Sequence, residues 1–175
     1  YDSGAAVAAL LVGAVVFIFF LAIAYVIFSF FYMKVFEKAG VQGKWRAWVP
    51  VYNDLIFAKL GDLSPWWVLI LYGAGLLLYI IPFIGFLGGL LFLAARVYLV
   101  LAAYRVGLKL RKEPVWVLLY VFLPVGWLGS AAFDKSTWQP VVAPAPWGNS
   151  FLVDKTVWQG VPAQPAASGG GSVQP

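Results

Sequence analysis

Between Ala5 and Phe31 the chain carries no charged side chain, and this run constrains the fold more than any other feature. A helix needs about 20 apolar residues to cross the hydrocarbon core of a bilayer. The run exceeds that length, and it also exceeds the apolar core of a signal peptide, which has about 7 to 15 residues. Of the 175 residues only 11% are charged, against about 25% in soluble domains. We therefore expect an integral membrane protein.

Three further apolar stretches predict three more membrane-spanning helices, at about residues 66–81, 83–104 and 115–133. Pro82 and Gly85 separate the second from the third, because the whole stretch is too long for one crossing. Pro114 opens the last span, and Pro124 predicts a kink inside it. The expected fold is all-α: a four-helix transmembrane bundle over residues 1–133, with an extended tail over 134–175.

The positions of the basic residues predict the orientation of this bundle. Nine of the 12 Lys and Arg residues fall in the two connections that lie on the same side of a four-span protein: Lys34, Lys38, Lys44, Arg46, Lys59, Arg105, Lys109, Arg111 and Lys112. By the positive-inside rule that side is cytoplasmic. We expect a multi-pass protein of a bacterial cytoplasmic membrane, with the N-terminus and the tail on the extracytoplasmic side.

The first of these connections contains a short predicted helix at about residues 50–60. Val51, Leu55, Ile56 and Leu60 share one face of it, while its polar residues lie elsewhere. This pattern favours an interfacial helix that lies in the membrane plane. The alternative is a re-entrant element that lines a cavity.

Six short motifs follow one another along the chain: Lys-Ala-Gly at 38–40, Trp45, Pro-Val-Tyr-Asn at 50–53, a Trp pair at 66–67, Leu-Pro at 123–124 and Ala-Phe-Asp-Lys at 132–135. As a set they resemble a family of small bacterial multi-span membrane proteins known as a domain of unknown function. The resemblance implies a membrane module that is sometimes attached to other domains, signal peptidases among them. It implies no activity and no catalytic residue.

Arg96 is an unusual charge, because it lies inside the predicted third span. An Arg at such a depth costs at least about 2.5–3.5 kcal/mol on insertion scales, so a partner is expected. The candidates are Asp54 or Asp62, backbone carbonyls freed by Pro82 or Pro124, or a group on another subunit. Snorkelling toward the head groups and a transport role are the alternatives.

Small residues recur at four-residue spacing in two of the spans. Ala5, Ala9 and Gly13 lie along one face of the first span, and Gly85 and Gly89 along one face of the third. Such faces let helix backbones approach closely. They serve either the protein's own bundle or a foreign helix.

Lys109, Arg111 and Lys112 form a basic cluster beside the membrane. Anionic lipids are the natural partners of such a cluster. Nucleic acid is not needed to explain its charge.

The tail contains a repeat that is offset by 20 residues. Asp-Lys-Ser-Thr-Trp-Gln-Pro-Val at 134–141 recurs as Asp-Lys-Thr-Val-Trp-Gln-Gly-Val at 154–161, with Trp147 between the copies. Trp is enriched among the residues that dominate protein interfaces. We therefore expect a partner to bind Trp138, Trp147 and Trp158, together with Asp134 and Asp154. Packing of the tail on the protein's own membrane domain is the alternative.

These observations favour a non-catalytic accessory or scaffold subunit of a larger membrane complex, for which a respiratory or photosynthetic host is one possibility. The chain has neither Cys nor His, so we expect no metal, no other cofactor and no enzyme that depends on these residues. A small oligomeric transporter or channel that uses Arg96 is the alternative. A membrane enzyme is disfavoured, because no spaced constellation of catalytic residues is present.

Overall fold

The computed structural model describes residues 2–139 and 144–162, and this part of the chain is helical without a β-strand. The expected all-α class is therefore confirmed. The elements are α1 (Ser3–Ala39), η1 (Lys44–Trp48), α2 (Tyr52–Leu60), α3 (Pro65–Tyr79), α4 (Gly85–Lys109), η2 (Pro114–Trp116), α5 (Val117–Phe122) and α6 (Pro124–Phe133). Among the described residues a single antiparallel bridge joins Leu63 to Val153.

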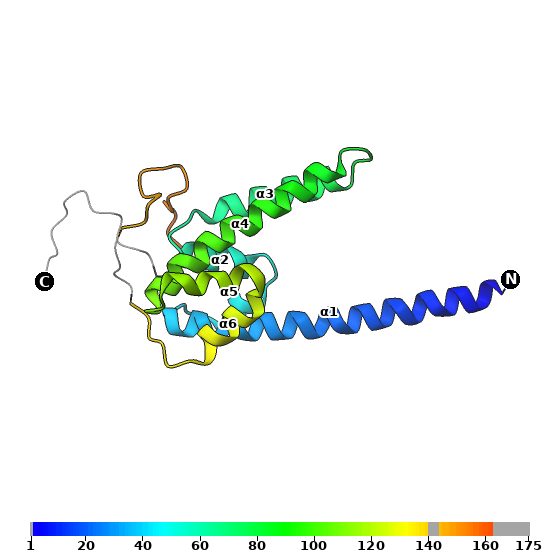
Figure 1. Cartoon of the computed structure of the whole chain (residues 1–175), viewed down its shortest axis with the longest axis horizontal. Helices are drawn as coiled ribbons and strands as arrows, with labels where there is room; N and C mark the ends of the chain where they lie inside the picture. Colours follow the sequence, from blue (N-terminus) through cyan, green and yellow to red (C-terminus); the bar gives the residue numbers. More distant parts are fainter. Residues whose placement is uncertain (1, 140–143, 163–175) are drawn as a thin grey trace, which may run out of the picture.

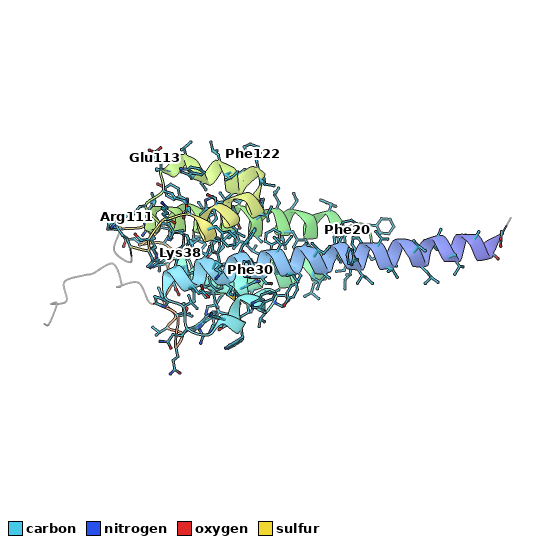
Figure 2. All side chains as sticks on the ribbon, turned by 90° about the horizontal axis from the view of Figure 1, so that it is seen from below. Phe20, Phe30, Lys38, Arg111, Glu113 and Phe122 are labelled. Atoms are coloured by element: carbon cyan, nitrogen blue, oxygen red, sulfur yellow. The ribbon has the colours of Figure 1, made fainter. Side chains whose placement is uncertain are left out.

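The molecule consists of a packed body from which two helical projections extend in the same direction (Figure 1). One projection is the N-terminal part of α1, and the other is the hairpin of α3 and α4. The body holds α2, the adjoining ends of α1 and α4, the α5–α6 segment and the described part of the tail. Lys38, Arg111 and Glu113 lie at the body end, whereas Phe20 lies near the middle of α1, toward the projection (Figure 2).

Helix α1 has 37 residues, which corresponds to a length of about 55 Å. The Asp2 side chain accepts a hydrogen bond from the Gly4 amide at its start, and Gly40 ends it with a left-handed backbone (φ 83°). Residues 2–27 are exposed, and burial begins at Phe28. Together with α4, α1 is one of two helices in the described chain that are long and apolar enough to cross a membrane.

Helices α3 and α4 form a hairpin and approach each other closely at two glycines, Gly75 and Gly88. A Cβ on Gly88 would collide with the Gly75 carbonyl oxygen, so only glycine permits this approach of the two helices. Helix α3 has 15 residues, or about 22 Å. Phe83 lies at the tip with a positive φ of 70° and is fully exposed.

The predicted fourth span is not a continuous helix. Residues 114–133 form η2, α5 and α6, and the chain turns at Leu123 (φ −145°, ψ 82°) before Pro124 starts α6. Lys112 and Asp134, which flank this segment, form an ion pair. A single helix would hold them about 33 Å apart. Residues 115–133 therefore form a hairpin whose two ends meet, and not the single kinked helix that the sequence predicts.

The tail and the α2 helix also differ from the expected arrangement. Asp134 pairs with Lys38 and Asp154 with Lys59, so the described tail lies at the same end as the basic connections and not at the opposite end. Residues Leu55 to Leu60 of α2 are all buried, Lys59 included. Helix α2 is thus an internal element of the body, because tail and helices cover the face that an interfacial helix would leave exposed.

Candidate functional site

A pocket of about 420 Å³ lies where α1, α2, α3 and α4 meet the turn between α5 and α6. We call it the Asp54 pocket. Its polar lining residues include Ser29, Tyr32, Asp54, Tyr72 and Arg96, and its apolar ones include Phe28, Phe92 and Leu99. A mostly apolar pocket with a few convergent polar groups is the usual form of a small-ligand site.

Asp54 is held by two tyrosines from different helices. The Tyr32 hydroxyl donates to Oδ1 at 2.7 Å, and the Tyr72 hydroxyl donates to Oδ2 at 3.0 Å. Burial raises the pKa of the Asp54 carboxyl above its usual value, although the two hydrogen bonds act in the opposite direction. The neutral form of Asp54 is thus favoured over a wider pH range than in an exposed aspartate.

The Pro-Val-Tyr-Asn motif positions Asp54 at the start of α2. The Tyr52 amide donates to the Pro50 carbonyl at 2.7 Å around Val51, whose φ of 66° and ψ of −50° make a strained γ-turn. The Asn53 side chain donates to the Ala47 carbonyl at 3.1 Å. A β-branched residue at positive φ is rare, and such strain tends to accumulate near functional sites.

Arg96 bonds to carbonyls at the break between α5 and α6. Its Nη2 donates to the Tyr120 oxygen at 2.8 Å and to the Val121 oxygen at 3.2 Å, and its guanidinium lies 4.9 Å from the centre of the Tyr120 ring. In a continuous helix the Tyr120 carbonyl would accept from residue 124, but Pro124 has no N–H. Of the partners considered for Arg96, the structure thus shows the carbonyls freed by Pro124.

The first copy of the tail repeat binds basic residues of the body. Asp134 pairs with Lys38 at 2.9 Å and with Lys112, and it also accepts from the amide and hydroxyl of Ser136. The Lys109 ammonium lies 5.4 Å from the centre of the Trp138 ring. Burial acts to raise the pKa of Asp134, but the hydrogen bonds from Lys112, Ser136 and Lys38 prevail and lower it well below its usual value.

The second copy repeats this arrangement on one buried lysine. Lys59 donates to Asp154 at 2.8 Å and to both oxygens of Thr156, and its ammonium lies 5.0 Å from the centre of the Trp158 ring. Thr156 in turn donates to Asp154 through its amide and hydroxyl. We call each repeat a lysine clamp: its Asp, the Ser or Thr two residues later and the Trp four residues later contact lysines of the body, which are several in the first clamp and Lys59 alone in the second.

Trp147, which lies between the two clamps in the sequence, is buried and donates from Nε1 to the Asp62 carbonyl at 2.9 Å. The three tail tryptophans, expected to bind a partner, thus contact the protein's own body. This is the alternative that the sequence left open. The two aspartates do the same through their ion pairs.

The three basic residues expected to bind lipid are in different environments. Lys109 is buried and donates to Asp62 at 2.7 Å, beside the 2.6 Å pair of Asp62 with Arg105. Lys112 is tied to Asp134. Only Arg111 among the three is exposed. The lipid binding expected of these three residues stays a prediction, and in the structure two of them balance carboxylates of the body.

Sequence reasoning identifies Asp54 and Arg96 but misses the tyrosines and Ser29 that share their pocket. The available signal is hydroxyl side chains inside otherwise apolar runs, at positions 29, 32 and 72. Tyr72 lies on a different helix from Ser29 and Tyr32, so only the tertiary arrangement brings all three together.

Comparison of the chain with protein-family models, with curated proteins and with solved structures found no match. The resemblance to the bacterial domain of unknown function consequently stays a prediction.

Proposed function

We propose that this chain is a multi-pass membrane protein in which α1, α3 and α4 cross the bilayer and α5–α6 enters it and returns. Two helices suited to span a membrane, the apolar α3 beside them and exposed aromatic residues such as Phe122 support this arrangement. Non-helical backbone inside a membrane is tolerated where protein groups satisfy it, and Arg96 does so for the Tyr120 carbonyl.

We infer that the body lies on the cytoplasmic side. Basic residues of both connections lie at this end, among them Lys38, Lys59 and Lys112. The positive-inside rule therefore favours a cytoplasmic position for the body. The tail then lies on the cytoplasmic side as well, because its clamps hold residues of those connections. The host is a cytoplasmic membrane.

We propose a non-catalytic accessory role, in which α1 docks on a transmembrane helix of a larger membrane protein complex. The observation that carries this proposal is the exposure of residues 2–27. A Cβ added at Gly13 would meet no described atom within 4 Å, whereas the glycine contact of α3 with α4 is used inside the chain. The face of α1 that carries the small residues Ala5, Ala9 and Gly13 is thus open to another helix.

The test is purification from the native membrane in mild detergent, with the copurifying proteins identified and quantified. Gly13→Leu would block close helix approach, and Gly89→Leu is the matched control, because Gly89 is equally open but lies on α4. We expect the wild type and the control to retain a stoichiometric partner that Gly13→Leu loses. Purification of the wild type alone, or equal retention by both variants, would contradict the docking role.

A small transporter is the second candidate, and the pocket that joins Arg96 to Asp54 is the observation that favours it. Intramembrane charges often line substrate pathways. Arg96→Met should then abolish flux in proteoliposomes while the copurifying proteins stay unchanged.

A further inference from the structure

The lining of the Asp54 pocket, partly apolar and partly polar, suits an amphipathic molecule. Phe28, where α1 leaves the body, and Phe92 on α4 line it, while its polar groups come mainly from α1, α2 and α4. A ligand in this place can keep an apolar chain between the projections and direct a polar head group toward the body.

Ser29 provides an independent sign that the pocket takes a ligand. Its side chain is 1% exposed and lines the pocket, yet its hydroxyl has no hydrogen-bond partner in the described part of the chain. A buried polar group without a partner is uncommon and carries a free-energy cost. A ligand atom at hydrogen-bonding distance would remove that cost.

Arg96 offers unused donors to a ligand in the pocket. The two hydrogen bonds of Arg96 both come from Nη2, so Nε and Nη1 make none to the described residues. The oxygens of Asp54 each accept from a tyrosine already. A guanidinium with unused N–H groups and a free hydroxyl that line the same pocket favour an anionic head group.

The depth of Arg96 indicates where this anion comes from. Arg96 is 11 residues from the start of α4, which places it about 16 Å along the helix. It therefore lies within the apolar projection and not at its charged end. A molecule that reaches it from the bilayer must be partly apolar.

We propose that the Asp54 pocket binds one anionic amphiphile, with a carboxylate or phosphate head group on Arg96 and Ser29 and an acyl chain along Phe28 and Phe92. Burial raises the pKa of the Asp54 carboxyl above its usual value, and this lessens the opposing charge that the head group meets. This proposal does not depend on the docking role of α1.

Native mass spectrometry of the purified full chain tests the proposal with three probes: oleate, dioleoyl phosphatidylglycerol and dioleoyl phosphatidylcholine. We expect one bound oleate or phosphatidylglycerol, and about tenfold weaker binding of zwitterionic phosphatidylcholine. Equal binding of all three probes, or binding of none, would overturn the proposal. Inorganic phosphate should not displace the bound amphiphile, and displacement at equal concentration would overturn the amphipathic part of it.

Arg96→Gln should weaken binding of the anionic probe about tenfold. Arg111→Gln is the control, because Arg111 is an exposed cation outside the pocket. Equal effects of the two variants would contradict a specific site.

Ser29→Ala keeps the test decisive if the Arg96 variant does not fold. A purely structural hydroxyl without a partner predicts an equal or higher melting temperature and no change in binding. The proposal predicts the same melting behaviour but about threefold to tenfold weaker binding of the anionic probe. Wild-type affinity in Ser29→Ala would contradict the role given to this hydroxyl.

Discussion

Helices α1 and α4 are both long and apolar enough to span a membrane, but they relate to the rest of the protein in different ways. No residue in the apolar 18-residue stretch of α1 is buried, whereas 33% of the corresponding stretch of α4 is buried. Helix α4 packs on α3 through Gly88 and enters the body through Arg105 and Lys109. Hydropathy alone does not distinguish such helices, because lipid and protein interiors are equally apolar. Glycine contacts and buried ion pairs do.

The largest expected effect concerns the charged end of α4. Asp62→Asn removes the carboxylate shared by Arg105 and Lys109, and breaking a buried pair costs about 3–5 kcal/mol. Glu37→Gln is the matched change at the end of α1, where the pairs with Lys34 and Lys44 are exposed and contribute up to about 1 kcal/mol. Thermal unfolding of the purified proteins in detergent measures both. Equal losses of stability would remove the distinction between the two helices.

Substitutions of one glycine on each helix test whether the apolar segments of α4 and α1 also differ in their packing. Gly88→Leu should destabilise the α3–α4 hairpin by about 1–3 kcal/mol or more, because its new side chain meets the Gly75 carbonyl and the backbone of Tyr79. Gly13→Leu should leave the stability of the isolated chain unchanged, since a Cβ there meets no described atom within 4 Å apart from the backbone of its own helix. Melting temperatures in the same detergent decide the point. A loss in Gly13→Leu as large as that in Gly88→Leu would show that α1 packs within the chain.

The smallest expected effect is the pH dependence of the clamp that joins the end of α1 to the loop after α4. The pKa of Asp134 is lower in the folded state than its ordinary value of about 4. Its contribution is therefore fully present above that value and is lost as the pH falls toward the folded-state pKa. The stability of the wild type should fall between about pH 4 and pH 2 more than that of Asp134→Asn, as measured by thermal unfolding. Parallel pH profiles would contradict a stabilising clamp.

The helical class, the two longest helices and the break at Pro124 can be predicted from the sequence. Gly40 and the proline at position 65 mark the end of α1 and the start of α3 through their backbone preferences. These features depend on neighbouring residues, so they can be derived from local patterns.

The features that sequence reasoning misses depend on distant residues. Pro124 is compatible with a kinked crossing as well as with a hairpin, and the pairing of Lys112 with Asp134 distinguishes them. The tail repeat is visible in the sequence, but its lysine partners are not. In the sequence these lysines are indistinguishable from the loop charges that determine membrane topology. Lys59 and Lys109 instead meet carboxylates inside the body, which no local pattern indicates.

The position of the tail tests the account most directly, and the absence of cysteine from the sequence provides a clean background for it. Single Cys substitutions at Ser3, Gln42 and Val157, all exposed, can be labelled in intact cells with a membrane-impermeant maleimide. If residues 115–133 form a hairpin, Gln42→Cys and Val157→Cys are both protected until the membrane is opened, while Ser3→Cys is labelled at once. Labelling of Val157→Cys together with Ser3→Cys, and not with Gln42→Cys, would show that residues 115–133 cross the bilayer and would contradict the hairpin.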